Sequence, residues 1–515
     1  MKSPRRVVAA LASGISVIAF TGPLEAQRGS SVDTALVRAV LTAEDRRDST
    51  DTALARALRS TDPHIRDLAR RARARIVDPT FSARDSLLHL PPPPSYADPA
   101  WRLRYRALSN RTSCDSLAAA LTDSAWAVRL HAVDLLRPEC GRNQALVRTL
   151  VAWVDSAPSN ARRTRGGASW HPAGHAIVAL ARIAREAAAP RFAQVAASLV
   201  PWLRTYAARA AAQMNDTTAL KRLAADPDDN VKESAIEGLA RIAGHAGDDQ
   251  YIAALTVRGY QAVRAAARAL QGSPRGGEVL PAVVAAAYRI RADSSETSRD
   301  TRLALLARIS EFAPTAAAPD LIPLATDFDC EVADSAAAIA ARLAQPRGPR
   351  SGHCTPLRAA VPSDAAALAL GRDVRLRVVM ADSSGGGSFV VRLRGDVAPI
   401  MAARILALAR TGYYNGLTWH RVEPDFVIQG GSPGANEYVG NPRYLRDELG
   451  TIAHNRGTVG MSTRGHDTGD AQWFVNLRDN ARLTRDYTVF GEVVDGIDVV
   501  DAILEGDVIA RIEQR

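Results

Sequence analysis

The 515-residue sequence is poor in aromatic residues, lysine and cysteine. Phe, Trp and Tyr make up only 5% of it, and only three of its 65 basic residues are lysines. Proteins that bind nucleic acid combine clustered basic residues with aromatic side chains. Here the arginines are spread through segments that also carry Asp and Glu, which is typical of solvated helix faces. The net charge of +10 therefore does not indicate a nucleic-acid partner.

The four cysteines are Cys114, Cys140, Cys330 and Cys354, and none of them lies in a CxxC motif or in a Cys/His metal-ligand spacing. The sequence therefore predicts no metal site. In an exported protein the two sequence-local pairs, Cys114 with Cys140 and Cys330 with Cys354, are candidates for disulfides. The alternative is four buried thiols, and spacing alone does not decide the connectivity.

Long apolar runs are missing except near the N-terminus. There Lys2, Arg5 and Arg6 precede an apolar stretch at 7–20 and a Leu-Glu-Ala ending. This pattern is typical of a secretory signal peptide over residues 1–26, and an uncleaved membrane anchor is the alternative. We therefore expect an exported protein, periplasmic or secreted, with no stable membrane insertion after the signal is removed.

Composition changes along the chain, which indicates two architectures. Residues 30–345 are rich in Ala, Leu and Arg, whereas Val, Gly and aromatic residues dominate after about residue 370. The Gly-, Pro-, Ser- and Ala-rich residues 346–372 are predicted to link the helical domain, 30–345, to a second domain, 373–515. Within the first domain, Pro91–Pro94 predicts an extended spacer.

The first domain repeats about every 30 residues, and each repeat opens an Ala-rich helix. In one copy Asp228 or Asp229 is placed to cap a helix whose apolar stripe includes Val231, Ala235 and Leu239. A single hairpin cannot bury such a stripe, so the units are expected to stack into an α-helical solenoid. They resemble HEAT repeats, which implies a concave face for a protein partner; a generic helical bundle is the alternative. The repeat starts lie at Ile65, Leu103, Val128, His175, Leu203, Val231, Val263, Thr301 and Val332.

Short strand patterns and two helix patterns make up the second domain. This combination predicts a closed β-barrel capped by helices. The run Ser383–Gly387 lacks GxGxxG order and a following helix, so it predicts a turn and not a phosphate-binding loop. Strands are expected at 374–380, 389–393, 417–429, 458–462, 472–476 and 489–493, and helices at 397–410 and 497–504.

The most specific stretch is WHRVEPDFVIQGG, residues 419–431. It predicts a strand that presents one cation, Arg421, and one amide, Gln429, beside an apolar wall. The glycine-rich turn that follows, Gly430–Gly434, allows the backbone to reverse.

Residues 373–515 resemble cyclophilin-type peptidyl-prolyl cis–trans isomerases. The resemblance implies isomerisation of X-Pro bonds in polypeptide clients, with no cofactor and no metal. It covers a little over a quarter of the chain. The matching stretches are 396–399 (DVAP), 414–416 (YNG), 419–422 (WHRV), 424–431 (PDFVIQGG), 447–448 (DE), 454–457 (HNRG), 460–462 (GMS), 472–474 (QWF) and 487–491 (YTVFG).

By this resemblance Arg421 is the catalytic arginine, and Gln429 and Phe426 complete the catalytic set. The barrier to rotation of a peptide bond is about 18–20 kcal/mol because the nitrogen lone pair is delocalised. A guanidinium presents several fixed donors and can stabilise charge that appears only as the bond twists. The implied substrate-binding residues are Val427, Ser462, Thr463, Gln472, Phe474, Leu483 and Tyr487.

Four positions depart from the family pattern. Val427 stands for a frequent methionine, Ser462 for alanine, Tyr487 for histidine, and Arg482 falls where cyclosporin-sensitive members carry tryptophan. We expect activity to be kept, but we do not expect strong cyclosporin binding. His420 is expected to be a buried structural histidine. The neighbouring carboxylates, expected to be turn and surface groups, are Glu423, Asp425, Asp447 and Glu448.

The leading hypothesis is an exported isomerase whose helical repeats position clients or a partner. A second hypothesis is a non-catalytic scaffold or chaperone that only binds proline-containing segments. A third is a helical-repeat adaptor in which the barrel is incidental.

Overall fold

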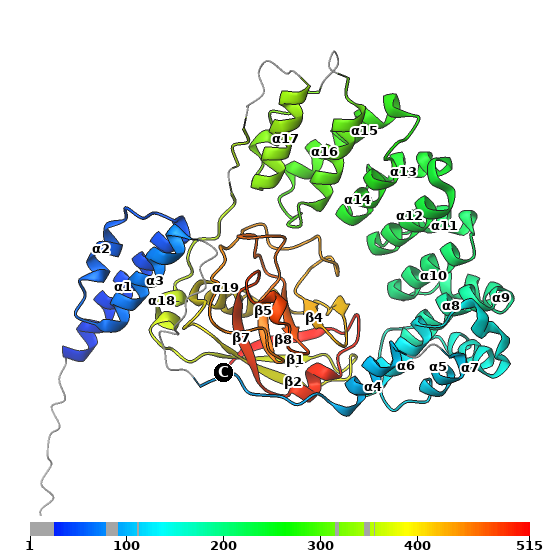
Figure 1. The fold of residues 1–515 in the computed structure, drawn as a ribbon, viewed down its shortest axis with the longest axis horizontal. Coiled ribbons are helices and arrows are strands. Elements are labelled where there is room, and N and C mark those ends of the chain that lie inside the picture. Colours follow the sequence, from blue (N-terminus) through cyan, green and yellow to red (C-terminus); the bar gives the residue numbers. More distant parts are fainter. Residues whose placement is uncertain (1–24, 79–90, 111–112, 315–318, 344–350, 355) are drawn as a thin grey trace, which may run out of the picture.

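The computed structural model describes residues 25–78, 91–110, 113–314, 319–343, 351–354 and 356–515 (Figure 1). All but the last two residues of the expected signal peptide, 1–26, lie outside this part of the chain. Within it, a helical region precedes a domain built on one antiparallel sheet, so the expected order of the two architectures is confirmed. No helix in these ranges is long and apolar enough to cross a bilayer.

Most of the helices form a curved array, defined here as α4–α17. Along it α8 packs on α10, α10 on α12, α12 on α14 and α14 on α16, so alternate helices share an inner row. The array comprises α4 (Ala100–Leu108), α5 (Cys114–Ala120), α6 (Trp126–Asp134), α7 (Gln144–Asp155), α8 (His171–Ile183), α9 (Arg185–Ala196), α10 (Pro201–Gln213), α11 (Thr217–Leu223), α12 (Asp229–Ala243), α13 (Asp248–Ala254), α14 (Tyr260–Ala269), α15 (Gly276–Ala292), α16 (Asp300–Phe312) and α17 (Cys330–Arg342).

Local sequence explains how these helices begin and which face they bury. Asp228 caps α12 by accepting hydrogen bonds from the backbone N–H groups of Asn230 and Val231. Val231 and Leu239 are fully buried on the stripe that follows.

Disulfides join Cys114 to Cys140 and Cys330 to Cys354, which are the two sequence-local pairs.

The first three helices do not continue the array, which differs from the expected 30–345 domain. Helices α1 (Glu25–Arg46), α2 (Thr52–Leu58) and α3 (Pro63–Val77) pack with α18 (Asp364–Ala369). Their apolar side chains share one core with residues 373–515. The physical reason lies on α3, where buried Arg71 donates to the Asp396 carbonyl at 2.8 Å and buried Arg75 to the Leu449 carbonyl at 2.7 Å.

Residues 91–99 contain neither helix nor strand, as the proline run predicts. They follow the surface of the sheet, where the Pro91 carbonyl accepts a hydrogen bond from Arg392 at 3.2 Å. The Tyr96 hydroxyl donates to the Val493 carbonyl at 3.0 Å. This segment therefore leads the chain from α1–α3 along the sheet domain to the array.

The sheet domain, residues 373–515, holds eight antiparallel strands in the order β3-β4-β6-β5-β7-β2-β1-β8. Beyond the two outer strands, segments 416–419 and 506–509 exchange hydrogen bonds, such as Trp419 N–H to the Asp507 carbonyl at 2.9 Å. Helices α19 (Pro399–Arg410) and α20 (Ile497–Asp501) flank the sheet. The strands are β1 (Arg375–Met380), β2 (Ser388–Leu393), β3 (Arg421–Val422), β4 (Val427–Gly430), β5 (Thr458–Met461), β6 (Trp473–Asn476), β7 (Val489–Asp495) and β8 (Ile509–Gln514).

Two expected elements are shorter than predicted. The strand expected at 417–429 is interrupted by a turn, in which Phe426 N–H bonds the Glu423 carbonyl at 2.8 Å. Pro424 lies in this turn and has no N–H to continue a ladder. The helix expected at 497–504 ends at Asp501.

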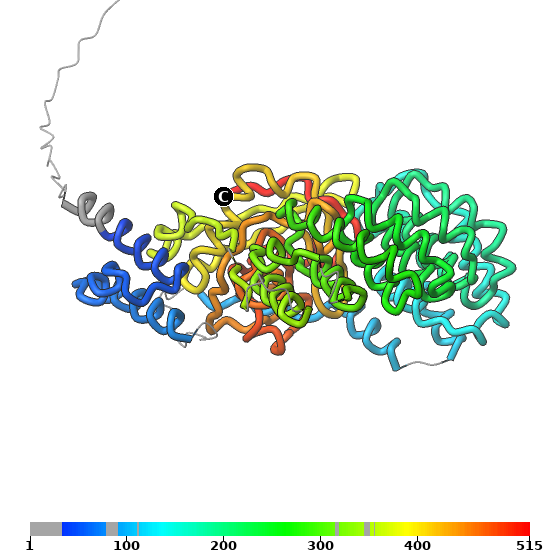
Figure 2. The backbone as a smooth tube through the Cα atoms, turned by 90° about the horizontal axis from the view of Figure 1, so that it is seen from above, coloured from blue at the N-terminus to red at the C-terminus, as the bar shows by residue number. Residues whose placement is uncertain are grey.

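The array curves round the sheet domain, and α1–α3 lie on the opposite side of it (Figures 1 and 2). Arg102 of α4 donates to Asp501 at 2.8 Å, and Arg163 pairs with Asp507. Asn230 at the start of α12 donates to the Gly434 carbonyl at 3.2 Å. The inner side of the array, expected to be open to a partner, is thus in contact with the sheet domain of the same chain.

Replacing Arg163 with Met is expected to lower the free energy of unfolding by about 3–5 kcal/mol, because it leaves the buried Asp507 carboxylate without its counter-charge. Urea denaturation followed by tryptophan fluorescence would measure the change. The control is Arg191→Met, which removes a half-exposed pair with Asp155 and should change stability by less than about 1 kcal/mol. Equal losses in both variants would contradict a stabilising contact between the array and the sheet domain.

Candidate active site

The sheet brings the expected apolar side chains together in a small pocket, called here the proline pocket. Val427 of β4, Phe474 of β6 and Leu483 form its core, with Phe426 and Tyr487 at the edge. The rings of Phe474 and Tyr487 meet edge to face at 5.7 Å. The cavity measures about 70 Å³ and is lined by Arg421, Phe426, Val427, Gln429, Glu437, Ser462, Thr463, Arg464, Phe474, Leu483 and Tyr487.

Strand register explains why these residues meet. Arg421 pairs with Gln429 across β3 and β4, and Gln429 pairs with Phe474 across β4 and β6, so their side chains lie on one face. Gly460 faces Phe474 from β5, where a Cβ would lie only 2.4 Å from the end of the ring. Glycine at this position therefore leaves room for the phenyl ring that forms the pocket floor.

Leu483 lies far along the chain and reaches the pocket through a short 3-10 helix, Ala481–Leu483. The side-chain amide of Asn480, just before this helix, donates to the Phe426 carbonyl at 3.1 Å. This bond fixes the segment against the loop that carries Phe426. Arg482, where cyclosporin-sensitive relatives carry tryptophan, places its guanidinium 4.6 Å from the centre of the Phe426 ring.

Arg421 lies at the mouth of the proline pocket with its guanidinium held by three side chains. Its Nε donates to Glu423 at 2.7 Å, and its Nη1 donates to Glu437 at 3.0 Å and to the Gln429 oxygen at 3.4 Å. Because 37% of the side chain remains exposed, the guanidinium is accessible to a ligand in the pocket. Glu423 was expected to be only a turn and surface group, and the structure shows it bound to Arg421.

Gln472 does not line the pocket but orients a residue that does. The Gln429 amide nitrogen donates to Ser462 Oγ at 3.0 Å and to the Gln472 side-chain oxygen at 3.2 Å. Gln472 in turn donates to the Val439 carbonyl at 3.1 Å. The amide of Gln429 therefore points its oxygen toward Arg421.

No motif or spacing in the sequence indicates that Glu437 or Arg464 belongs to this site. Glu437 belongs to an irregular loop, residues 432–440, and reaches Arg421 only through the tertiary fold. Arg464 donates to the second oxygen of Glu437 at 2.5 Å. Burial raises the pKa of the Glu437 carboxyl, but Arg464 and Arg421 outweigh this effect and lower the pKa overall. Glu437 therefore stays ionised beside Arg421 at neutral pH.

The 432–440 loop is docked on the array. Thr297 N–H donates to the Tyr438 carbonyl at 3.1 Å, and Gly440 N–H donates to the Ser295 carbonyl at 3.2 Å. The guanidinium of Arg264 in α14 lies 5.3 Å from the centre of the Tyr438 ring. Together with the bond from Asn230 to the Gly434 carbonyl, these contacts hold the loop to the array before and after Glu437.

The histidines near the site are buried and neutral. Burial lowers the pKa of His420 and of His454 to about 4. The His454 ring stacks on Phe474 behind the pocket, with centroids 5.8 Å apart.

Two carboxylates that were expected at the surface, Asp447 and Glu448, are buried because they accept hydrogen bonds inside the fold. Glu448 accepts hydrogen bonds from the first N–H groups of α19, and Asp447 accepts one from His466.

Across the described ranges, no group of three His, Cys, Asp or Glu side chains is placed to hold a metal ion. The site instead combines a guanidinium, an oriented amide and an apolar pocket on one face of a sheet. This arrangement is suited to binding a planar amide whose nitrogen belongs to a small apolar ring.

Residues 377–514 match the family model described as cyclophilin type peptidyl-prolyl cis-trans isomerase/CLD. A peptidyl-prolyl cis-trans isomerase of Helicobacter pylori is 35% identical over 133 residues, which are 24% of this chain and 80% of that protein. Peptidyl-prolyl cis-trans isomerase B of Bacillus subtilis is 35% identical over 130 residues, 25% of this chain and 90% of that protein. Through this domain the chain belongs to the cyclophilin-type peptidyl-prolyl cis-trans isomerases.

Other relatives share only this domain. The peptidyl-prolyl cis-trans isomerase-like 2 of Gibberella zeae is 37% identical over 119 residues, and the match spans 22% of this chain and 21% of that protein. The family model thus matches residues of the sheet domain, and its match does not extend to the helical array.

Changing Glu437 to Gln is expected to lower kcat about 3- to 10-fold with little change in KM, because Arg421 loses one of its two charged partners. An exchange assay on an X-Pro peptide would separate the two constants. Glu437→Asp keeps the charge and should restore part of kcat. Glu513→Gln removes an exposed carboxylate paired with Arg511 and is the control. An unchanged kcat in Glu437→Gln would contradict a positioning role.

The isomerisation rate constant is expected to vary by less than about twofold between about pH 6 and about pH 8, because the histidines at the site have pKa values of about 4. Each of the two buried histidines should nevertheless contribute a loss of stability as the pH drops below about 6.5. In that range the unfolded chain binds protons at His420 and His454, whereas the folded protein does not until about pH 4. An activity inflection near neutral pH would contradict these assignments.

Proposed function

We propose that this protein accelerates cis–trans isomerisation of X-Pro bonds in polypeptide clients after export. The observation that carries the proposal is the position of Arg421 at the mouth of the pocket formed by Phe426, Phe474 and Leu483. The pocket holds the proline ring, while the guanidinium faces the amide that precedes it.

The chemistry requires no covalent intermediate. As the X-Pro bond twists, the nitrogen lone pair localises and the nitrogen becomes pyramidal. Arg421 donates to the carbonyl oxygen or to the nitrogen in this twisted state, and its contacts with Glu437 and Gln429 orient it beforehand. Phe474 and Leu483 fix the ring, so that the acyl side rotates against it.

Export is supported by two features. The N-terminal pattern of Lys2, Arg5 and Arg6 before an apolar stretch is typical of a signal peptide over residues 1–26. The disulfides Cys114–Cys140 and Cys330–Cys354 fit an oxidising compartment, either the periplasm or the extracellular space.

We further infer that α4–α17 form a HEAT-like solenoid and that the sheet domain is a closed barrel. Successive helices that stack so that alternate members share one inner row support the first inference. Hydrogen bonds between 416–419 and 506–509 support the second. In this proposal the isomerase domain is 373–515, the linker is 346–372, and the solenoid comprises the array within 30–345.

Arg421→Ala is expected to reduce kcat/KM about 100- to 1000-fold, because it removes the donor for the twisted amide. The measurement is two-dimensional NMR exchange between cis and trans forms of an X-Pro peptide with the full chain, which needs no coupled protease. Arg511→Ala, which removes an exposed arginine of β8, is the control and should keep full activity.

The alternative function is a non-catalytic scaffold that binds proline-containing segments. If the wild-type chain bound the peptide without raising its exchange rate, this scaffold would replace the enzyme. If Arg421→Ala exchanged the peptide as fast as wild type, the catalytic assignment of Arg421 would be wrong.

A further inference from the structure

A cavity of about 370 Å³ lies between the array and the sheet domain, beside the proline pocket. We call it the seam cavity. Helices α4, α6, α8 and α10 form one wall, and residues 422–426 and 504–505 form the other. Phe426 lines both the seam cavity and the proline pocket. Glu423 of the seam wall also bonds Arg421. A client bound at the proline pocket therefore has this space directly beside it.

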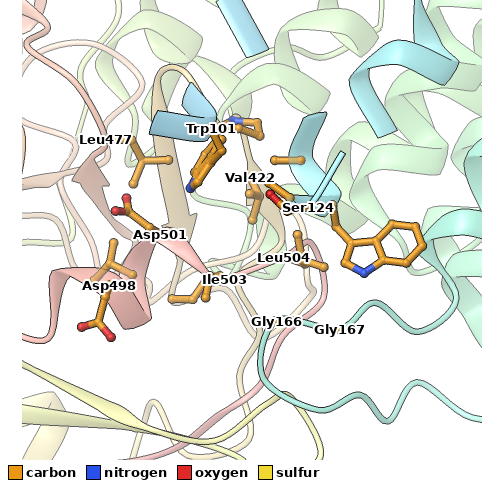
Figure 3. Close-up of a pocket in the computed structure, with 16 residues that line it drawn as sticks. Trp101, Ser124, Gly166, Gly167, Val422, Leu477, Asp498, Asp501, Ile503 and Leu504 are labelled. Atoms are coloured by element: carbon orange, nitrogen blue, oxygen red, sulfur yellow. The ribbon is translucent and has the colours of Figure 1, made fainter. Parts of the chain in front are cut away.

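The seam cavity continues into a second, more apolar cavity of about 180 Å³ (Figure 3). The two share Ala127 of the array with Val422, Pro424 and Leu504 of the sheet domain. Figure 3 shows Trp101 and Ile503 among the side chains around this second space. The seam cavity and the apolar cavity thus adjoin each other between the two domains, and the seam cavity also shares Phe426 with the proline pocket of the sheet domain.

Charge distinguishes the seam cavity from the rest of this basic protein. Four carboxylates line it, and no Lys or Arg is among its lining residues. Arginines outside the lining bind two of the four: Arg106 and Arg478 pair with Asp425, and Arg421 pairs with Glu423. The other two carboxylates are those of Asp134 and Glu505.

Asp134 and Glu505 receive hydrogen bonds from uncharged or weakly basic groups. Asp134 accepts from His175 at 2.7 Å, and Glu505 accepts from the Tyr206 hydroxyl at 3.1 Å. Arg182 donates to the backbone carbonyl of Asp134. Arg209 stacks on the Tyr206 ring at 4.5 Å and attracts both carboxylates through space, without an ion pair to either.

The remaining histidines of the cavity add no positive charge at neutral pH. Burial lowers the pKa of His171 to about 3 and also lowers the pKa of His131. The His131 ring stacks on Tyr105, with centroids 4.0 Å apart. Aromatic faces next to carboxylates form an environment that favours a cation, through cation–π contacts and charge-assisted hydrogen bonds.

We propose that the seam cavity binds a Lys or Arg side chain of the client close to the isomerised proline. This proposal rests on the proposed isomerase function. Because Phe426 lines both spaces and three extended residues span about 10 Å, we place the basic residue within about three positions of the proline. The array thereby supplies part of the substrate site and selects clients by charge.

The test uses the full chain and two series of X-Pro peptides. In one series Lys is placed in turn at each of three positions on either side of the X-Pro pair, and in the other Gln takes its place. For at least one position, KM for the Lys peptide is expected to be about tenfold lower, with kcat unchanged. Asp134→Asn combined with Glu505→Gln should abolish the preference and leave KM for the Gln peptides unchanged.

The matched control is Asp155→Asn on α7, an array carboxylate outside the seam cavity, which should keep the Lys preference. Equal KM values for Lys and Gln peptides at every position would overturn the seam-cavity proposal while the isomerase function stands. A preference that survives in the double variant would also overturn it. If no peptide were isomerised, the proposed isomerase function would be wrong. The charge preference would then be tested by binding: a lower Kd for a Lys peptide than for the matching Gln peptide would support it, and equal Kd values would overturn it.

Discussion

Buried arginines hold the array against the sheet domain, and the remaining features of the molecule depend on this contact. Arg102 and Arg163 reach from the array to Asp501 and Asp507. A guanidinium removed from water is stable only where carboxylates and carbonyls meet its donors in the right directions. The two domains therefore fit together in one relative position, and the cavities between them have defined walls.

The relative position of the two domains also affects the side chains around Arg421. The array contacts the backbone of the 432–440 loop, and this loop directs Glu437 toward Arg421. The orientation of Arg421 therefore depends in part on helices outside the sheet domain. The array is therefore also a structural support of the site.

The sequence was most informative where function depends on local order. The motif containing Arg421, Phe426 and Gln429 predicted a cation, a ring and an amide beside one another, and strand register brings them together. Leu483 and Phe474 could be assigned only through the family resemblance. Glu437 could not be predicted, because its contact with Arg421 requires the 432–440 loop to dock on the array. No periodicity or spacing encodes such a long-range contact.

The repeat pattern predicted a helix that opens near Ile65, within α3, as part of the repeat domain, but it did not predict where α1–α3 pack. Their amphipathic pattern fits a repeat array as well as it fits a sheet surface. The guanidinium groups of Arg71 and Arg75 decide between the two, since their acceptors are carbonyls at Asp396 and Leu449, more than 300 residues away. Local sequence does not predict contacts between residues so far apart, because they form only in the complete fold.

The core that α1–α3 share with residues 364–515 has a consequence for synthesis. These helices are made before the array, yet the surface that covers their apolar side chains is made after it. The array between them contains mainly contacts between neighbouring helices and can form while the chain is still growing. Helices α1–α3 must therefore stay unpartnered until the sheet domain has been made. Chain termination before residue 364 would leave a folded array attached to an exposed, aggregation-prone helical segment.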